Sequence, residues 1–248
     1  MSFELAANRL SADVVSFQSS ISSLQKGESL QDTVYTLNAM GIDLYCIRHS
    51  SPGSPQLVNK YSGKPVINGG DGRHSHPTQA LLDIFSIWER LGDLKGLKIT
   101  IVGDILNSRV VRSNLIGMGK LGAKVTVCGP KTLMPGNMES VYNCRVEYDL
   151  PRALKDADVV MGLRMQLERM TEGLFPSLEE YSKHYVLSKE TLKYAKKNAL
   201  IMHPGPMNRG VEILPEIADS NHSIIVEQVA NGVAVRMALM FLILGGKA

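Results

Sequence analysis

Short apolar runs and longer amphipathic stretches alternate along the chain, and this pattern predicts alternating strands and helices. We expect strands at residues 13–17, 44–47, 98–102, 124–128, 159–163 and 200–202. We expect helices at residues 29–40, 55–60, 78–91, 108–121 and 232–244. Such alternation is typical of an α/β protein with a doubly wound parallel sheet. The length of 248 residues allows one or two domains of this kind.

The composition is that of a globular protein, with 44% hydrophobic and 21% charged residues. The net charge is +3 and the basic residues are scattered, so we expect no nucleic-acid partner. No apolar stretch reaches the roughly 18 residues of a membrane span, and the first residues lack a signal pattern. Cys46, Cys128 and Cys144 are odd in number and lack the spacing of a zinc site. We therefore expect a cytoplasmic protein that binds neither nucleic acid nor a membrane.

Charged residues follow several predicted strands, at the positions where an open parallel sheet binds its ligands. The residues at these strand ends are Arg48 with His49, Gly103 with Asp104, Arg164, and His203. Three of the four ends carry Arg or His, which favours an anionic small molecule as the ligand.

The segment from His203 to Gly210, with the sequence HPGPMNRG, predicts a rigid binding loop. Pro204 and Pro206 each fix φ and remove a backbone donor. The loop is therefore expected to present its carbonyl groups and its glycine to a ligand.

Three side chains beyond residue 100 are candidates for holding carboxylates. Arg164 and Gln166 directly follow a predicted strand, where charge-assisted hydrogen bonds could hold a carboxylate. Arg109 combines its guanidinium donors with a predicted helix N-terminus, which also suits an anion. Arg112, one turn later, fits a solvated or paired side chain.

Two further positions have both a functional and a structural interpretation. Arg48 could polarise a carbonyl group or hold phosphate, or it could form a surface ion pair. His76 stands at a predicted helix N-terminus, where a neutral ring can still donate to an oxygen. A single His is often structural, but Gln79 adds a donor and an acceptor one turn later.

The segment from Gly117 to Gly122 matches the G-x-G-x-x-G pattern of dinucleotide-binding proteins. That motif must follow a strand and open a helix. Here it ends a predicted helix and leads into a strand, so we interpret it as a helix end and turn.

Ser22 and Lys26 lie in a polar loop ahead of a predicted helix. Such residues can serve as ordinary helix-capping material. A Lys in a loop can also reach a neighbouring site.

Taken in chain order, six segments resemble those of the aspartate carbamoyltransferase family, within the aspartate/ornithine carbamoyltransferase superfamily. They are Ser22-Ser-x-x-Lys26, Ile47-Arg48-His49, His76-Pro-Thr-Gln79, Ser108-Arg109, Leu163-Arg164-x-Gln166-x-x-Arg169 and His203-Pro-Gly-Pro206. The resemblance covers essentially the whole sequence.

The resemblance implies transfer of the carbamoyl group of carbamoyl phosphate to the amino group of L-aspartate, in pyrimidine biosynthesis. It implies no metal and no organic cofactor. By similarity, Arg48, His76 and Gln79 contact the carbamoyl group, and Gly205 and Pro206 offer carbonyls to its NH2. Also by similarity, Arg109 takes the α-carboxylate of aspartate, while Arg164 and Gln166 take its side-chain carboxylate.

The resemblance further implies a homotrimer in which Ser22 and Lys26 complete the active site of the neighbouring subunit. It leaves open a regulatory chain or a dihydroorotase-type enzyme as an additional partner.

The family pattern implies two doubly wound parallel-sheet domains joined by helices. We expect a carbamoyl-phosphate-binding domain at residues 1–77 plus 231–248, and an aspartate-binding domain at residues 78–230. The family's Ser-x-Arg-Thr-Arg segment would precede the helix that begins at Ser2, so the N-terminal domain is expected to be truncated and the chain to have little activity. The alternatives are a catalytically weak binding or assembly partner and a carbamoyltransferase with another acceptor.

Overall fold

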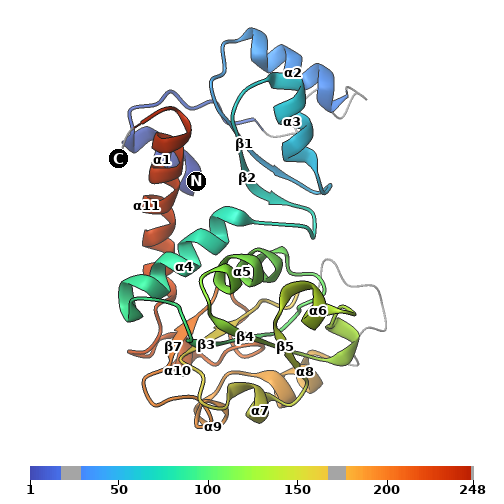
Figure 1. Cartoon of the computed structure of the whole chain (residues 1–248), viewed down its shortest axis with the longest axis vertical. Coiled ribbons are helices and arrows are strands. Elements are labelled where there is room, and N and C mark those ends of the chain that lie inside the picture. The colour runs from blue at the N-terminus through green and yellow to red at the C-terminus, as the bar shows by residue number, and fades with distance from the viewer. Residues whose placement is uncertain (18–28, 167–176, 247–248) are drawn as a thin grey trace. The chain divides into compact units, whose positions relative to one another are not determined.

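A computed structural model describes residues 1–17, 29–166 and 177–246. The chain forms two compact units, Met1–Thr78 with Ala230–Ala248, and Gln79–Val229 (Figure 1). Within the described residues both units contain parallel sheets with helices, which confirms the predicted α/β class.

The second unit is built on a parallel sheet with the strand order β5-β4-β3-β6-β7. Its strands are β3 (Lys98–Val102), β4 (Lys124–Cys128), β5 (Arg145–Glu147), β6 (Val159–Gly162) and β7 (Leu200–Met202). Four of them were predicted. The prediction missed β5, which has only three residues and a partly exposed pattern that carries little apolar signal.

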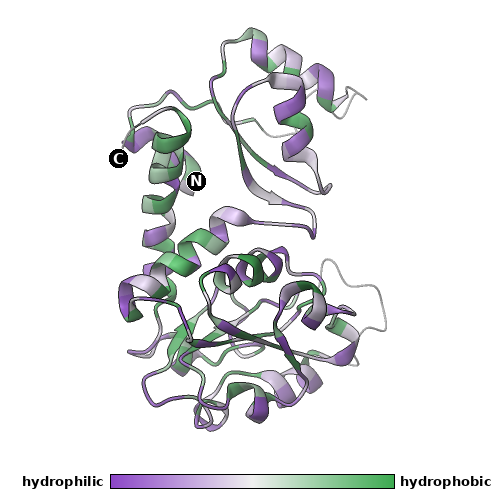
Figure 2. Cartoon of the chain, viewed as in Figure 1, coloured by the Kyte–Doolittle hydropathy of each residue, from purple (hydrophilic) through white to green (hydrophobic). Residues whose placement is uncertain are grey.

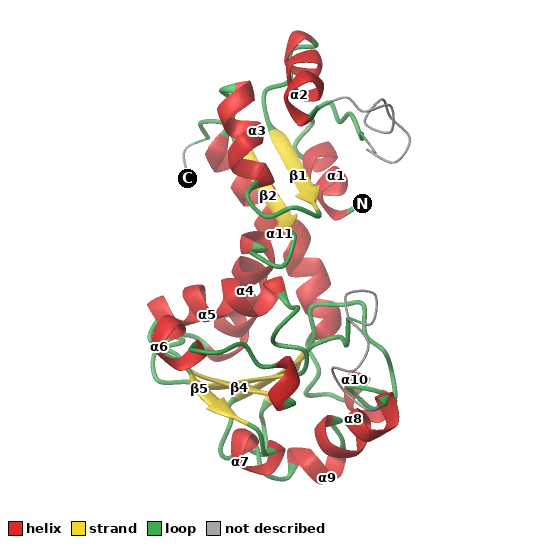
Figure 3. Cartoon of the chain, turned by 90° about the vertical axis from the view of Figure 1, so that its right-hand side faces the viewer, coloured by secondary structure: helices red, strands yellow, loops and turns green. Residues whose placement is uncertain are grey.

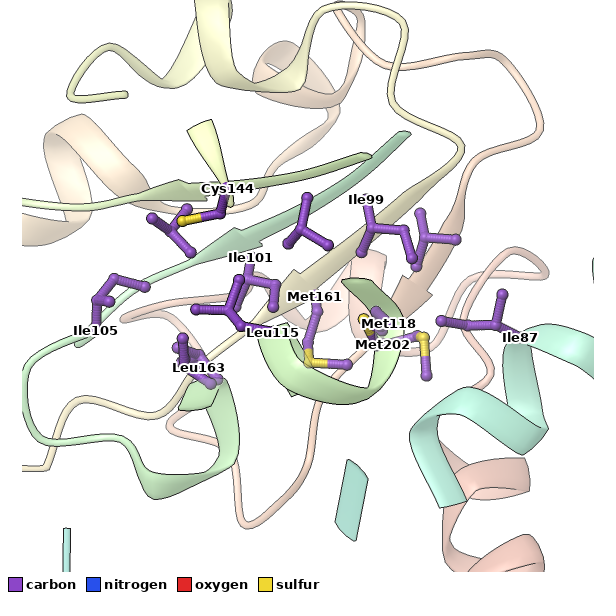
Figure 4. Close-up of a cluster of buried hydrophobic side chains, with 14 of the residues drawn as sticks. Ile87, Ile99, Ile101, Ile105, Leu115, Met118, Cys144, Met161, Leu163 and Met202 are labelled. Atoms are coloured by element: carbon purple, nitrogen blue, oxygen red, sulfur yellow. The ribbon is translucent and has the colours of Figure 1, made fainter. Parts of the chain in front are cut away.

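Alternate side chains of these strands form two separate cores. Ile99, Ile101 and Met161 pack with Leu115 and Met118 of α5 (Arg109–Lys120) on one face (Figure 4). The intervening residues Val102, Val160 and Ile201 pack with α7 (Leu150–Leu154) and neighbouring loops in a second cluster. Strands that are apolar on both faces are typical of a parallel sheet covered by helices on both sides.

The second unit has further helices among its described residues. They are α4 (Pro77–Leu91), α6 (Met138–Tyr142), α8 (Leu178–Tyr185), α9 (Lys189–Leu192) and α10 (Pro215–Ala218), with a short 3-10 helix, η2 (Lys131–Leu133). Side chains of Ser108, Asp149, Ser177 and Ser188 cap α5, α7, α8 and α9 by accepting backbone N–H groups. Each such cap contributes about 1 kcal/mol.

The G-x-G-x-x-G segment lies where the sequence predicted it. Gly117 and Gly119 belong to α5, and Gly122 follows the helix with a positive φ of 79°. The segment therefore ends a helix instead of opening one, so it lacks the geometry of a dinucleotide site.

The first unit contains two parallel strands, β1 (Tyr45–His49) and β2 (Val66–Asp71) (Figure 3). Its helices are α1 (Ser2–Arg9), α2 (Leu30–Ala39) and α3 (Ser54–Ser62), together with most of α11 (Ile225–Ile243). Its core packs Ala6 and Ala7 against Ile67, Val233 and Met240.

The predicted strand at residues 13–17 is wrong. The structure has neither strand nor helix from 12 to 17, and Val14, Val15 and Phe17 are exposed. The alternation suited a strand, but strand hydrogen bonds need a neighbour, and none of the described strands pairs with this segment.

Other boundaries differ from the prediction in ways that matter for function. Arg48 and His49 are the last residues of β1 and do not follow it. β2 was missed because Asn68, Gly69 and Gly70 interrupt its apolar pattern. Helix α11 begins at Ile225 and not at residue 232 as predicted. The prediction missed its first turns because they contain polar residues.

Helix α11 is long and apolar enough to cross a membrane, judged by length and composition alone (Figure 2). It has 19 residues, and its best window has a mean hydropathy of 1.4. The expectation of no such stretch is therefore corrected: polar residues, Glu227, Gln228, Asn231 and Arg236, interrupt the apolar residues of this helix and conceal its length. A single such helix is weak evidence for a membrane span, since core helices of soluble proteins also have this length and composition.

A buried carboxylate, Asp71 at the end of β2, organises the turns of the first unit. One oxygen accepts hydrogen bonds from Gly53 N and His74 Nδ1, both at 2.9 Å. The other accepts from the Asn68 side chain and from the Ser75 N–H and hydroxyl. Burial alone would raise the pKa of Asp71, but these hydrogen bonds outweigh it and hold the pKa well below the usual range.

We expect Asp71 to make stability depend on pH. An unfolded aspartate has a pKa of about 3.9, and the folded value is lower. The stabilisation by Asp71 is therefore complete above about pH 4 and is lost as pH falls through the folded pKa, by at most about 1.4 kcal/mol per pH unit. Asp71→Asn should lower the free energy of unfolding by roughly 1 to 3 kcal/mol at pH 6 and by less at pH 3.

Urea unfolding followed by circular dichroism at several pH values measures this difference. Asp43→Asn is the control, because Asp43 is exposed and only pairs with Lys64 at 3.7 Å. An Asp71→Asn effect that is equal at pH 6 and pH 3 would contradict the prediction.

Candidate substrate-binding site

Arg48 offers its guanidinium group near the end of β1. The residue is exposed, and within the described part of the chain its side chain makes no hydrogen bond or ion pair. The surface ion pair considered as its alternative role is thus not formed with any described residue. Its five donors remain available to an anion or a carbonyl oxygen.

His76 immediately precedes α4 and is buried. Its Nδ1 lies 3.3 Å from the hydroxyl of Thr78. The segment before it, from Gly72 to Ser75, is the turn that Asp71 holds. The ring is therefore placed by a constrained backbone at the start of a 15-residue helix.

Gln79 lies in the first turn of α4, and its amide Nε2 donates to Asp83 Oδ1 at 2.9 Å. A carboxylate can only accept from this amide, so the carbonyl oxygen of Gln79 must face away from Asp83. Gln79 therefore presents an acceptor to its surroundings.

In the second unit, strand order brings three predicted site segments to one edge of the sheet. β6 pairs with β3 on one side and with β7 on the other, and all three are parallel. The segments carrying Arg109, Arg164 and His203 follow these three strands. Their carboxyl ends lie at the same edge, as expected for a ligand site in such a sheet.

Close backbone contact holds the segments after β3 and β6 together. The N–H of Leu163 donates to the carbonyl of Val102 at 2.8 Å. Gly103 has a φ of 139°, and a Cβ added there would lie 2.9 Å from both the Cβ and the carbonyl oxygen of Leu163. Only glycine allows this approach, which fixes the backbone directly before Arg164.

Arg109 is the first residue of α5, and its side chain is buried and has interaction partners in the protein. The turn ahead of it is rigid, because Asp104 accepts hydrogen bonds from the backbone and side chain of Asn107. Arg112 donates to the carbonyls of Ser108 and Leu106 at 3.2 and 3.1 Å, as expected for a paired side chain. Arg112 thus shapes the turn that carries Arg109.

Arg164 and Gln166 are half buried, on either side of a fully buried residue, Met165. Met165 packs against Leu133 and Tyr181, which anchors the segment. The two polar side chains are therefore held near the sheet edge by the packing of the residue between them.

The loop after β7 has backbone acceptors but lacks free backbone donors from 204 to 206. Gly205 and Pro206 are exposed, and the peptide bond between them is cis. Pro204 and Pro206 have no N–H, and the N–H of Gly205 donates to Nδ1 of His203 at 3.0 Å. Between residues 204 and 206 the backbone is left with acceptors only.

His203 and Glu212 support this loop from inside. His203 Nδ1 accepts from Gly205, so the proton of a neutral ring is on Nε2, which lies 3.3 Å from Glu212 Oε1. That approach lacks hydrogen-bond geometry, and both Nε2 and Glu212 Oε2 are buried without a hydrogen-bond partner among the described residues. Glu212 Oε1 also accepts the N–H of Asn208 at 2.5 Å.

Several sequence-predicted site residues lie outside the described part of the chain. These are Ser22, Lys26 and Arg169. Their roles stay predictions.

The described residues offer no obvious nucleophile or metal centre. Burial, with smaller contributions from Glu147 and Asp149, raises the pKa of Cys128 to about 12, so its thiol stays protonated. In the parts of the chain that the structure describes, no group of three or more His, Cys, Asp or Glu residues could hold a metal ion.

Sequence reasoning missed the buried polar residues that hold the site together. They are Asp71, Asp83, Glu212 and Gln228. A signal existed for Asp83, which lies one helical turn after Gln79 and faces the same side of the helix. No local pattern marks Gln228, whose partners are far away in sequence.

Two family descriptions match the chain. The carbamoyl-P binding domain of aspartate/ornithine carbamoyltransferase matches residues 1–89. The Asp/Orn binding domain of the same family matches residues 95–243.

The similar sequences include aspartate carbamoyltransferase catalytic subunits of bacteria. The subunit of Moorella thermoacetica is 56% identical over 99% of this chain and 80% of its own length. That of Syntrophus aciditrophicus is 53% identical over 100% of this chain and 80% of its own length.

Solved structures share the fold. Aspartate transcarbamoylase from Trypanosoma cruzi, in complex with N-(phosphonacetyl)-L-aspartic acid, has a TM-score of 0.85 and 27% identity, covering 100% of this chain and 79% of the other. Ornithine carbamoyltransferase from Pyrococcus furiosus has a TM-score of 0.86 and 30% identity, covering 100% of this chain and 80% of the other. With both halves matched and more than half of the residues identical to a catalytic subunit, the chain belongs to the aspartate/ornithine carbamoyltransferase family.

Proposed function

We propose that this protein transfers the carbamoyl group of carbamoyl phosphate to the amino group of L-aspartate, giving N-carbamoyl-L-aspartate and phosphate. The observation that carries the proposal is its 52–56% identity to aspartate carbamoyltransferase catalytic subunits over 97–100% of the chain. The residues at the sheet edge suit two anionic substrates.

The acceptor is recognised through its two carboxylates. Arg109 binds the α-carboxylate at the N-terminus of α5, where the helix dipole adds to the guanidinium charge. Arg164 and Gln166 bind the side-chain carboxylate. A cationic acceptor side chain such as that of ornithine would instead face the positive charge of Arg164.

The chemical step is addition of the amine to the carbamoyl carbon, followed by loss of phosphate. Negative charge develops on the carbonyl oxygen during addition, and Arg48 and His76 donate hydrogen bonds to it. A preorganised donor of this kind contributes on the order of 10² to 10³ in rate.

No protein nucleophile takes part in this mechanism. The amino group of aspartate attacks directly, and the protein contributes by holding both substrates in a reactive geometry. Gly205 and Pro206 accept hydrogen bonds from the carbamoyl NH2 through their carbonyls.

We further propose a homotrimer with shared active sites, in which Ser22 and Lys26 reach the neighbouring subunit. We also propose a cytoplasmic location, which the three free cysteines support. Proteins of a reducing compartment commonly retain free thiols.

Purified protein incubated with carbamoyl phosphate and L-aspartate should form N-carbamoyl-L-aspartate and equimolar phosphate. The rate also tests the expectation, drawn from the family pattern, that the chain has little activity. Chromatography with a phosphate assay measures both products. L-Ornithine in place of aspartate should give little product. Formation of citrulline at the higher rate, or no carbamoyl transfer to either acceptor, would contradict the proposal.

Arg164→Ala should mainly weaken aspartate binding, because it removes charge-assisted hydrogen bonds worth roughly 1.5 to 3 kcal/mol. The KM for aspartate should rise about tenfold or more, while the KM for carbamoyl phosphate barely changes. Arg152→Ala, which removes an exposed Arg of the same unit, is the matched control. Unchanged aspartate saturation in Arg164→Ala would rule out the assigned role.

Mixing Lys26→Ala chains with His76→Ala chains should restore activity if subunits share sites. In a trimer some sites then receive an intact Lys26 from one chain and an intact His76 from another. Hybrids separated by a charge tag should exceed both parents in activity per site. Hybrids no more active than the better parent would contradict shared sites.

A further inference from the structure

The carboxylate of Asp83 in α4 collects three amide side chains from three different helices. Its Oδ1 accepts from Nε2 of Gln79 at 2.9 Å and from Nε2 of Gln228 in α11 at 2.8 Å. Its Oδ2 accepts from Nδ2 of Asn114 in α5 at 2.8 Å. All four side chains are buried, and all belong to the second unit.

This arrangement fixes which end of each amide faces the site. A carboxylate has no proton to donate, so each amide must turn its NH2 group toward Asp83. The oxygen of Gln79 is then the atom left to face a ligand. Within the described residues no donor reaches that oxygen, and it is not among the fully buried unsatisfied atoms.

Gln228 links Asp83 to the loop after β7, because the orientation of its amide is fixed in the same way. Because its NH2 group is held by Asp83, its Oε1 faces His203 and accepts the backbone N–H of that residue at 2.9 Å. This bond fixes the start of the loop that carries Gly205 and Pro206. From 204 to 206 that backbone offers only acceptors, as described above.

Two separate parts of the site therefore offer acceptor oxygens to a ligand: the Gln79 side chain, whose oxygen is turned away from Asp83, and the loop backbone, which has no free N–H from 204 to 206. A substrate group placed between them must supply the hydrogen atoms. An NH2 group satisfies both parts, whereas a methyl group of similar size leaves the acceptors without partners.

We propose that Asp83 is a positioning residue that makes the site select an NH2 group over a methyl group on the transferred carbonyl. This inference rests on the proposed function. It explains why the protein would use a carbamoyl donor and not an acetyl donor. Asp83 acts through Gln79 and Gln228 and does not touch the substrate. A site built to receive hydrogen bonds discriminates strongly against an analogue that lacks the donor.

Two stable probes test the proposal without turnover. Phosphonoacetamide carries an NH2 group where 2-oxopropylphosphonate carries a methyl group, and calorimetry gives the dissociation constant of each. The wild-type protein should prefer the amide by about tenfold or more. In Asp83→Ala the preference should fall at least about fivefold, because the Gln79 amide is free to rotate and present its NH2 group.

Two further variants separate positioning from general destabilisation. Asp83→Asn keeps one acceptor oxygen for Gln79 and Gln228, and Asn114 can rotate its buried, unpartnered Oδ1 toward the new amide. The preference should therefore return to within about threefold of wild type. Met118→Ala creates a cavity in the core next to α5, so it lowers stability without touching these amides and should leave the preference unchanged.

If Asp83→Ala fails to fold, nuclear magnetic resonance of the wild-type protein can test whether Asp83 holds the Gln79 amide when the ligand is bound. Coupling across the hydrogen bond from Gln79 Nε2 to the Asp83 carboxyl carbon should persist with phosphonoacetamide bound. Loss of that coupling would overturn the inference.

The binding results distinguish failure of the proposed role of Asp83 from failure of the proposed function. A wild-type preference that Asp83→Ala leaves unchanged overturns the role of Asp83 but not the proposed function. Binding of neither probe by the wild-type protein overturns the proposed function and this inference with it.

Discussion

Parallel pairing of β6 with β3 and β7 is the constraint on which the site residues of the second unit depend. Parallel strands place their carboxyl ends at one edge, so segments that are about 40 residues apart or more in sequence meet there. In the observed register Ile99 of β3 pairs with Val159 of β6, and alternate side chains of the strands fill the two cores. The ligand-binding edge is thus a consequence of how the sheet buries its side chains.

Buried carboxylates then set the fine geometry in both units. Asp71 holds the turns around β1 and β2, Asp83 holds three amides, and Glu212 supports the loop after β7. Asp71 and Asp83 each accept several hydrogen bonds, which offset the cost of burying their charge, whereas Glu212 accepts the N–H of Asn208 and keeps one buried oxygen without a hydrogen-bond partner among the described residues. A buried carboxylate is costly, but it fixes the orientation of neighbouring amides. Because it can only accept hydrogen bonds, every amide bound to it must turn its NH2 group toward it.

The chemistry proposed for the site fits this construction. Transfer of a carbamoyl group needs no covalent intermediate with the protein, so rigidly placed donors and acceptors are sufficient. The buried amide network around Asp83 agrees with a site that acts through hydrogen bonds. The match to the catalytic subunit of Moorella thermoacetica, at 56% identity, extends over 99% of the chain.

The sequence by itself determined the parallel-sheet class, four strands of the second unit, the helix-end reading of Gly117 to Gly122, and the family. These features have local signals: apolar runs, capping residues, and short motifs such as His203-Pro-Gly-Pro206. Local signals failed for residues 13–17, which alternate like a strand but pair with no described strand, and for β2, whose glycines hide it. Tertiary structure alone decided strand order and the partners of Asp71 and Asp83. Gln228 lies 145 residues from Asp83, and no local pattern of polar residues can specify a hydrogen bond that exists only once the chain is folded.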